Sequence, residues 1–537
     1  MPTWARSATE EGVHWNMLLY LVSTQPRANL SAVREAAEVL FSTEDIEVRH
    51  VSTLQGVVKP SEEYRVVTTS PDASLIEPAL STWGRPNWFF VHMGEWTFPL
   101  DDAGIERVLR ELARQGEWAT AKDLNGFVCL LDRLEHRTQL RARPTSLQLE
   151  TTNRCNASCV MCNHLYSSEP PDPDFSRLAE RLDEVIPYLR MILLHGNGEP
   201  FLAPDIADRI RVFHDYGIAL TTNTNLSVLN DELLELLNSC FFEVRVSCDG
   251  CSRRTYEGIR RGLSFDRFVT NARLLRDRTP RLRKVMVAVL MRQNLTEVAD
   301  LVDFAADLGF SELSFQELGT NAVIGNQGDS PRLFPHLAAN QFREAVLRAR
   351  ELGVRLSYPG LVDLTLEDDQ KLTEETERAQ REPLYPSTDD VTEIRRRALT
   401  LGEGNMRPIE RLDSCSWQDG SYRCRGICSW CVERPYVDTR GNVFPCCINA
   451  TYSLGNIFEH DSFLELWNDD LYQQVRASFH EERLPAFCEG CQFLSTGSTS
   501  YVRVLDHDPL KWVKRHVSGL YLSKRDYLGK EGGNTHA

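Results

Sequence analysis

Three cysteines in one short stretch of the sequence have the spacing of iron ligands. Cys155, Cys159 and Cys162 follow a CxxxCxxC pattern directly after an apolar run, Leu147–Thr151, that predicts a strand. Three thiolates can ligate three irons of a [4Fe–4S] cubane, which leaves the fourth iron without a protein ligand. Because a structural metal site normally closes its coordination sphere, an open iron indicates a site that binds a further molecule. Spacing alone leaves one alternative open, a zinc knuckle whose fourth ligand is missing or is supplied by His164.

A second group of cysteines lies near the carboxyl end of the sequence. It follows the order C-x12-G-x4-C…CxxC and consists of Cys428, Gly441, Cys446, Cys488 and Cys491. We expect a hairpin around Asp438–Gly441 that presents Cys428 and Cys446 from adjacent strands. The other cysteines of this region can complete a second site, and Cys431 can replace Cys428 as a ligand; they are Cys415, Cys424, Cys431 and Cys447. A zinc ribbon is the alternative for this module.

From Ser146 onward the sequence alternates strand-like and helix-like segments. Six apolar runs predict strands at Ser146–Glu150, Met191–His195, Ala219–Thr222, Glu243–Ser247, Val285–Leu290 and Glu312–Phe315. Helical periodicity lies between them at Ser176–Leu189, Asp205–Tyr216, Asp231–Leu237, Phe265–Arg276 and Thr296–Leu308. The alternation predicts an α/β fold with a parallel sheet, and we favour a partial (β/α)6 barrel over an open doubly wound sheet. Functional residues are then expected at the carboxyl ends of the strands.

Short motifs follow the first four predicted strands. The first strand leads into the Cys155 motif, and the next three are followed by His195-Gly-Asn-Gly-Glu-Pro200, Thr222-Asn-Thr-Asn225 and Ser247-Cys-Asp-Gly250. In this order the motifs resemble those of the radical S-adenosylmethionine (SAM) superfamily, which has a GGEP, often a Thr-Asn-Gly, and a Ser-x-Asp-Gly. The resemblance covers about residues 146–320. It implies a partial TIM-like barrel, a [4Fe–4S] cluster and SAM.

The resemblance assigns the main cofactor contacts. Cys155, Cys159 and Cys162 would hold the cluster, whose open iron would chelate the amino and carboxylate groups of SAM. Backbone groups of Gly198 and the carboxylate of Glu199 suit the ammonium group of SAM, because a buried cation requires an anion or a carbonyl beside it.

Further residues at the strand ends are candidates for weaker roles. Ser247 and Asn225, grouped with Asn223, could hydrogen-bond the ribose or the carboxylate of SAM, although an Asn in a loop often only caps a turn. Residues Val287–Met291 could wall the adenine. Cys248 is a candidate catalytic thiol that would return a hydrogen atom to a substrate radical, which would permit epimerisation.

The cysteine group near the carboxyl end resembles the SPASM or twitch extension of radical SAM enzymes, which carries auxiliary iron–sulfur clusters. The resemblance implies at least one such cluster, with Cys428, Cys446, Cys488 and Cys491 as its ligands.

The two resemblances together imply an oxidoreductase that cleaves SAM reductively to a 5′-deoxyadenosyl radical and abstracts hydrogen from a substrate C–H bond. Modification of a ribosomally made peptide or another natural product is the leading hypothesis, and dehydrogenation or epimerisation of a sugar or cyclitol is the second. A zinc-binding scaffold without catalysis is the alternative from another class. Expected partners are the peptide or small-molecule substrate and an electron donor such as flavodoxin or ferredoxin.

Composition bounds these hypotheses. The chain has 537 residues, which favours several domains, and a net charge of −17, which argues against a nucleic-acid partner. Without an apolar run of about 20 residues we expect no membrane association, and without a signal-like start we expect a cytoplasmic protein. The expected divisions are an N-terminal α/β domain (1–140) that enters the next through a hairpin at Gly126–Leu140, the core (141–360), a charged linker (361–410), the cysteine module (411–495) and a tail (496–537). Within the N-terminal domain, residue spacing predicts helices at Ser31–Leu40 and Asp102–Arg114.

Overall fold

The structure is a computed structural model. It describes residues 17–22, 46–51, 65–68, 88–93, 96–99, 102–134, 136–162, 175–319, 326–381, 407–408, 430–446, 452–481, 485, 488 and 501–504. The helix predicted at Ser31–Leu40 lies outside these residues.

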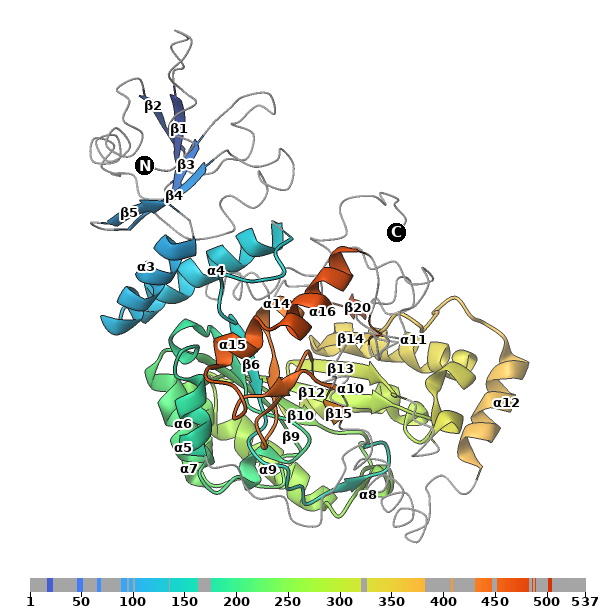
Figure 1. The fold of residues 1–537 in the computed structure, drawn as a ribbon. Helices are drawn as coiled ribbons and strands as arrows, with labels where there is room; N and C mark the ends of the chain where they lie inside the picture. Colours follow the sequence, from blue (N-terminus) through green and yellow to red (C-terminus); the bar gives the residue numbers. More distant parts are fainter. Residues whose placement is uncertain are drawn as a thin grey trace.

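The N-terminal region contains a small mixed sheet followed by two helices (Figure 1). The strands have the order β2-β1-β3-β4-β5 and are β1 (Met17–Val22), β2 (Ile46–Val51), β3 (Arg65–Thr68), β4 (Trp88–Met93) and β5 (Trp96–Pro99). Helix α3 (Asp102–Arg114) occupies its predicted range. The hairpin predicted at Gly126–Leu140 is wrong, because α4 (Trp118–Leu134) runs through most of it. Ala121, Leu124 and Val128 are fully buried and have helical spacing.

The main sheet has eleven strands in the order β19-β17-β16-β6-β8-β9-β10-β12-β13-β14-β20. Its central parallel strands are β6 (Ser146–Leu149), β8 (Met191–Leu193), β9 (Ala219–Thr224), β10 (Phe241–Ser247), β12 (Arg283–Leu290), β13 (Glu312–Glu317) and β14 (Arg355–Pro359). The predicted α/β fold class is confirmed, and all six predicted strands are present. The sheet does not close, because β6 pairs with β16 and β14 pairs with β20 instead of with each other.

Helices connect the parallel strands and lie around the outside of the sheet (Figure 1). They are α5 (Phe175–Leu182), α6 (Ile206–Asp215), α7 (Asp231–Cys240), α8 (Arg253–Ile259), α9 (Phe265–Arg278), α10 (Val298–Asp307), α11 (Pro335–Leu352) and α12 (Asp369–Gln380). Helix α12 lies within the segment predicted as a charged linker, and its Glu375 accepts a hydrogen bond from the amide of Leu337 on α11 (2.9 Å). Single turns of 3-10 helix are η3 (Ile186–Tyr188), η4 (Pro200–Leu202), η5 (Leu295–Glu297), η6 (Gln327–Asp329) and η7 (Pro331–Leu333).

Alternation along the strands separates two faces of the sheet. Val244 and Val246 of β10 are fully buried and pack with the apolar residues of the surrounding helices in one large core. Arg245 and Ser247 alternate with them and therefore face the inside of the curved sheet. The helices thus bury the outer face, while on β10 the inner face carries polar side chains.

The carboxyl region extends the main sheet. Its elements are β15 (Arg407–Pro408), α14 (Trp430–Glu433), β16 (Tyr436–Val437), β17 (Asn442–Phe444), β18 (Tyr452–Ser453), β19 (Gly455–Asn456), α15 (Phe463–Trp467), α16 (Asp470–His480) and β20 (Tyr501–Val504). The predicted hairpin around Asp438–Gly441 is present as β16 and β17, and Gly441 has the left-handed φ of 81° that its turn requires. Strand β16 runs parallel to β6, so this module continues the sheet of the core.

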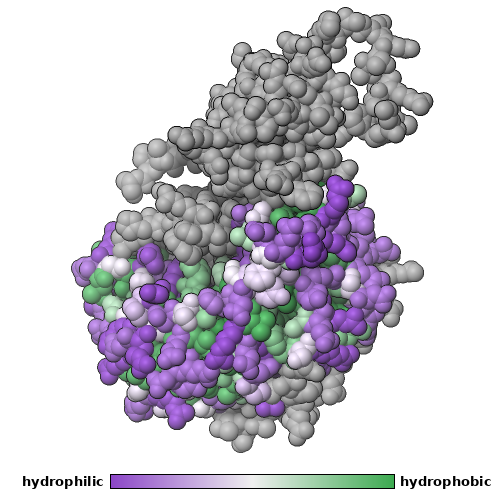
Figure 2. Space-filling view, turned by 90° about the vertical axis from the view of Figure 1, so that its left-hand side faces the viewer, coloured by the Kyte–Doolittle hydropathy of each residue, from purple (hydrophilic) through white to green (hydrophobic). Residues whose placement is uncertain are grey.

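The described surface is mainly polar. Figure 2 shows hydrophilic residues over much of the coloured face, with apolar residues in separate groups between them. No helix in the described part of the chain is long and apolar enough to cross a lipid bilayer.

Candidate active site at the carboxyl ends of the strands

The predicted cluster-binding cysteines lie on the loop that follows β6. Within it, β7 (Ser158–Cys159) pairs antiparallel with β11 (Arg260–Arg261), so that Cys159 lies opposite Arg260. The amide of Val160 donates to the carbonyl of Ile259 (3.0 Å), and that of Cys162 donates to the carbonyl of Cys159 (3.1 Å). The loop is therefore anchored by backbone hydrogen bonds to the chain after β10.

The surroundings of these thiols suit an iron–sulfur cluster. Cys155 and Cys159 are partly buried and Cys162 is exposed. Burial raises the pKa of Cys155 to about 11 and that of Cys159 to about 12, and the charges of the three sulfurs act on one another. The guanidinium Nη1 of Arg260 lies 3.9 Å from the sulfur of Cys159. Thiols that are neutral alone become thiolates when they bind iron, and a buried cation beside them offsets that charge.

His164, the possible fourth ligand in the zinc-knuckle alternative, lies outside the described residues. Among the described residues, no group of three His, Cys, Asp or Glu side chains is close enough to hold one metal ion. In a cubane each thiolate binds a different iron, so the ligands stand further apart than around one zinc.

Arg260 is itself held by a buried carboxylate. Its Nη2 pairs with Oδ2 of Asp249 (2.7 Å), and both side chains are buried. Oδ1 of Asp249 accepts the amide of Val289 on β12 (2.7 Å). The Asp of the Ser-x-Asp-Gly motif therefore acts as a structural anchor for the cation beside the cluster loop. The sequence motif includes Asp249 without indicating its role, and nothing in the sequence motifs predicts Arg260 as a site residue.

Glu199 lies between the second and third strands with its carboxylate directed into a set of donors. Its Oε1 accepts the hydroxyl of Thr224 (2.6 Å) and its Oε2 accepts the amide of Asn225 (2.7 Å). Its own amide donates to the carbonyl of Arg154 (2.8 Å), which ties it to the cluster loop. Burial raises the pKa of Glu199 to about 7, and a cation bound beside its carboxylate would favour the charged form.

Gly198 lies where two loops touch. A Cβ built on it would be 2.6 Å from the carbonyl oxygen of Arg154, and nearer still to that of Thr152. Only glycine allows this approach. The structure therefore brings Gly198 and Glu199 against the segment that carries Cys155.

The remaining predicted SAM contacts differ in their surroundings. The Oδ1 of Asn225 accepts the amide of Ser227 (2.9 Å), and its Nδ2 donates to Asn156 (3.0 Å), so this side chain does cap a turn. The Oδ1 of Asn223 is buried and has no hydrogen-bond partner among the described residues. Ser247, at the end of β10, is partly exposed on the inner face.

Cys248 faces away from this inner surface. It is fully buried in the apolar core, and its thiol donates to the carbonyl of Gly250 (3.3 Å). Cys251 is partly buried, and both its amide (2.8 Å) and its thiol (3.4 Å) donate to Glu297. Neither thiol is directed toward Glu199 by the contacts it makes.

A buried carboxylate that sequence reasoning missed connects the core to the carboxyl module. Glu150, directly after β6, accepts hydrogen bonds from the amide of Asn197 (2.7 Å), the hydroxyl of Tyr436 (3.1 Å) and the amide of Thr439 (3.1 Å). A Cβ on Gly196 would lie 2.5 Å from its side chain. The GNGEP loop and the β16–β17 hairpin are thus joined through one side chain.

The predicted auxiliary-cluster ligands are described only in part. Cys446 directly follows the hairpin and is partly buried, and Cys488 is buried. Cys428 and Cys491 lie outside the described residues, as do Cys415, Cys424 and Cys447. Cys431 is buried in α14, where its carbonyl accepts Nε of Arg476 (3.0 Å).

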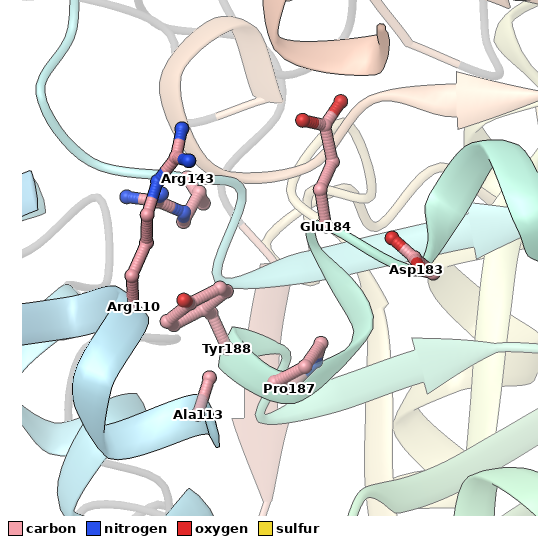
Figure 3. Close-up of a pocket in the computed structure, with 7 residues that line it drawn as sticks. All are labelled: Arg110, Ala113, Arg143, Asp183, Glu184, Pro187 and Tyr188. Carbon is pink, nitrogen blue, oxygen red and sulfur yellow. The ribbon is translucent and has the colours of Figure 1, made fainter.

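A cleft of about 250 Å³ lies at the opposite ends of the strands from the cysteine loop (Figure 3). It is lined by Arg110, Ala113, Arg143, Asp183, Glu184, Pro187 and Tyr188. Arg143 pairs there with Glu106 (2.9 Å) and stacks 4.5 Å from the ring centre of Tyr188. These residues precede β6 and β8, so the cleft lies at the amino ends of the strands, away from Cys155 and Glu199.

Comparison with known families agrees with this geometry. Residues 149–305 match the model of the radical SAM superfamily, and residues 428–492 match that of SPASM, described as an iron–sulfur cluster-binding domain. The chain contains a radical SAM domain and a SPASM domain. The first domain implies a [4Fe–4S] cluster with SAM, and the second implies auxiliary iron–sulfur clusters.

Curated relatives match this chain over limited regions. A tungsten-containing aldehyde ferredoxin oxidoreductase cofactor-modifying protein of Pyrococcus furiosus is 39% identical over 94 residues, which are 17% of this chain and 26% of the relative. An AdoMet-dependent heme synthase of Methanosarcina barkeri is 27% identical over 171 residues, 31% of this chain and 48% of the relative. The chain thus spans a quarter to a half of the length of these relatives.

Solved structures match parts of the chain at low sequence identity and low TM-score. Streptococcus suis SuiB bound to precursor peptide SuiA is 17% identical, with a TM-score of 0.42 over 66% of this chain and 71% of that one. Native anSMEcpe with bound AdoMet and the Cp18Cys peptide is 16% identical, with a TM-score of 0.40 over 62% of this chain and 82% of that one.

Proposed function

We propose that this chain is a radical SAM oxidoreductase that abstracts hydrogen from a C–H bond of a peptide or another natural product. The observation that carries the proposal is the loop of Cys155, Cys159 and Cys162, which offers three thiols beside the buried cation Arg260 and beside Glu199. Three ligands leave one iron of a cubane for SAM. When bound, the cluster and SAM supply a 5′-deoxyadenosyl radical, while the protein binds, orients and excludes water.

The chain's own residues would hold SAM from one side. Glu199 is buried, and an ammonium group beside it would restore its charge. Its two oxygens already accept bonds from Thr224 and Asn225, which set its orientation, and a carboxylate has about four acceptor positions, so it can accept further hydrogen bonds. Because Gly198 has no side chain, nothing from this residue covers the backbone groups next to Glu199. SAM would therefore meet a preorganised anion instead of reorganising the loop.

The SPASM domain would serve the substrate after hydrogen abstraction. Cys446 and Cys488, with Cys428 and Cys491, would hold an auxiliary cluster that accepts an electron from the substrate radical, which gives a net two-electron oxidation. A flavodoxin or ferredoxin would supply the electron that starts each turnover. The pairing of β16 with β6 supports these separate roles, because it places the cysteine module in the same sheet as the core.

The substrate class is the least constrained part of the proposal. A peptide is favoured by the resemblance to SPASM-type enzymes, many of which modify peptides. The names of the two sequence relatives concern a cofactor-modifying protein and a heme synthase, so a small molecule is the competing substrate.

Anaerobic reconstitution tests the proposal. The wild-type protein should bind iron and sulfide and form 5′-deoxyadenosine from SAM when reduced. Replacing Cys155, Cys159 and Cys162 by Ala should abolish that product, and Cys488→Ala should preserve part of it while stopping substrate turnover. Cys240→Ala, on α7 and remote from both cysteine groups, is the matched control and should behave as wild type. A colourless protein loaded with zinc, or 5′-deoxyadenosine from the triple variant, would exclude this function.

A further inference from the structure

Three polar side chains form a row on the inner face of the sheet. Asn223 of β9 is paired in register with Arg245 of β10. Leu193 of β8 is paired with Thr221, so His195, two residues further along, lies beside Asn223 on the same face. His195 starts the GNGEP loop and Ser247 follows Arg245 by two residues. The row therefore lies directly below the residues proposed to bind SAM.

The row contains polar atoms that the described part of the protein leaves without partners. Nδ1 of His195, Oδ1 of Asn223 and Oε1 of the neighbouring Gln148 are buried, and no hydrogen bond from the described residues reaches them. Gln148 is 2% exposed, and its Nε2 donates to the carbonyl of His195 (3.1 Å). Buried polar groups normally have partners, and each one left unpaired costs about 1–3 kcal/mol. Such a group of unpaired atoms on the inner face points to a bound polar molecule.

Arginines outnumber carboxylates among the ion-paired side chains of β10, β12, β13 and β14 on this face. Glu150, which follows Gln148 by two residues and lies directly after β6, already accepts three hydrogen bonds. Arg283 pairs with both Glu243 and Glu312 (2.6 Å to the latter), and Arg355 also reaches Glu312 (3.3 Å). Arg245 is left with a longer contact to the shared Glu243 (3.4 Å) and keeps 28% of its side chain exposed. Three guanidinium groups thus share two carboxylates, in a chain whose net charge is −17.

A second cation strengthens this field. Burial lowers the pKa of His195 to about 3, and the positive charges of Arg245 and Arg434 act on it in the same direction. The imidazole is therefore neutral near pH 7 and can donate one hydrogen bond. The guanidinium of Arg434 otherwise stacks on the ring of Trp430, 3.7 Å from its centre.

We propose that His195 and Arg245 bind an anionic group of the substrate, a carboxylate or a phosphate, and that the amide oxygens of Asn223 and Gln148 accept hydrogen bonds from donor groups of the same molecule. The guanidinium of Arg245 can meet such a group with two parallel hydrogen bonds, and His195 can donate a third. This subsite rests on the proposed function, because it lies where a substrate would have to sit below SAM. It would set which part of the substrate faces the radical.

Anion binding to the cluster-loaded, unreduced enzyme with SAM tests the subsite. Thermal unfolding is followed in sodium phosphate and in sodium acetate, each against sodium chloride of equal ionic strength. We expect the wild-type Tm to rise in at least one of the two anions beyond the chloride control, and the responding anion identifies the group. Arg245→Gln should weaken that anion by at least tenfold, and Arg245→Lys should retain part of the effect because it keeps the charge.

Two further variants keep the test decisive. Arg348→Gln removes a surface arginine that pairs with Asp303 and should respond as wild type. Asn223→Asp places a carboxylate beside Arg245 and should abolish the anion response, whether or not Arg245→Gln folds. No response in the wild type, or an equal response in Asn223→Asp, would overturn the subsite, since anions would then bind elsewhere and water alone would fill the row. SAM cleavage in the same preparations reports on the proposed function separately.

Discussion

Replacement of Gly198 by Ala should damage SAM binding through backbone contact alone. The added Cβ would lie 2.6 Å from the carbonyl oxygen of Arg154, below the 3.0 Å that Cβ atoms essentially never pass, and closer still to that of Thr152. Neither obstacle is a flexible side chain, so the GNGEP loop and the cluster loop must separate by about 1 Å. Overpacking of this kind costs about 1–3 kcal/mol.

The cost should appear in two measurements. Urea unfolding should show that the free energy of unfolding falls by about 1–3 kcal/mol. If SAM binding must restore the position of Glu199 at the same free-energy cost, the affinity for SAM should fall about 5- to 150-fold. Binding of SAM to the reconstituted, unreduced protein can be measured by calorimetry, and iron and sulfide content shows whether the cluster is retained.

A glycine elsewhere in the chain provides the control. Gly319 is exposed and lacks a left-handed φ, and no atom of the described residues lies within 4 Å of the position that a Cβ would occupy. Gly319→Ala should therefore leave SAM binding unchanged and stabilise the chain by about 0.4–1 kcal/mol through the unfolded state. If Gly198→Ala matched Gly319→Ala in both stability and SAM affinity, the close approach of the two loops would not be a property of the protein in solution.

Further predictions concern buried charges. Because burial raises the pKa of Glu199 from 4.5 to about 7, its stabilising contribution is complete below pH 4.5 and is lost as pH rises through 7; relative to Glu199→Gln, metal-free wild type should lose about 2–3 kcal/mol in urea unfolding between pH 5 and 8. Tyr436→Phe should lower the free energy of unfolding by about 1 kcal/mol, because it removes one hydrogen bond to Glu150. Glu150→Ala should lower it by about 3 kcal/mol or more and weaken SAM binding, because it leaves two buried amides unpaired. Equal losses in urea unfolding for the two variants would argue against the shared role of Glu150. Asp249→Asn should cost about 3–5 kcal/mol in urea unfolding by leaving Arg260 buried without its anion, and an unchanged midpoint would show that the pair is solvated.

Local sequence signals were sufficient for the elements of the core. Strands such as β10 alternate buried apolar residues with polar ones, because helices cover only their outer face, and the helices between the strands begin at clear caps. Asn230 accepts the amide of Leu233 at the start of α7, and Ser264 accepts that of Arg267 at the start of α9. These signals act over three or four residues, so they can be recognised without knowledge of the fold.

Elements that depend on distant partners were missed. Strand β20 pairs with β14 across more than a hundred residues, and nothing within Tyr501–Val504 indicates that partner. The error at Gly126–Leu140 has a different cause. A hairpin is predicted there, although Leu124 and Val128 repeat at the spacing of a helix that packs on one side.

The candidate site divides along the same line. A parallel sheet brings the carboxyl ends of its strands to one edge, so motifs that follow successive strands must meet, and Cys155, Gly198 and Glu199 were predictable on that ground. Glu150 was not, because its partners Tyr436 and Thr439 lie 286 and 289 residues away and belong to a different domain. In the sequence it is one carboxylate after a strand. Its contacts connect the GNGEP loop to the β16–β17 hairpin only because β16 pairs beside β6. The lateral edge strand of a sheet exposes unpaired backbone groups, and here the strand that covers β6 belongs to the module that contains Cys446.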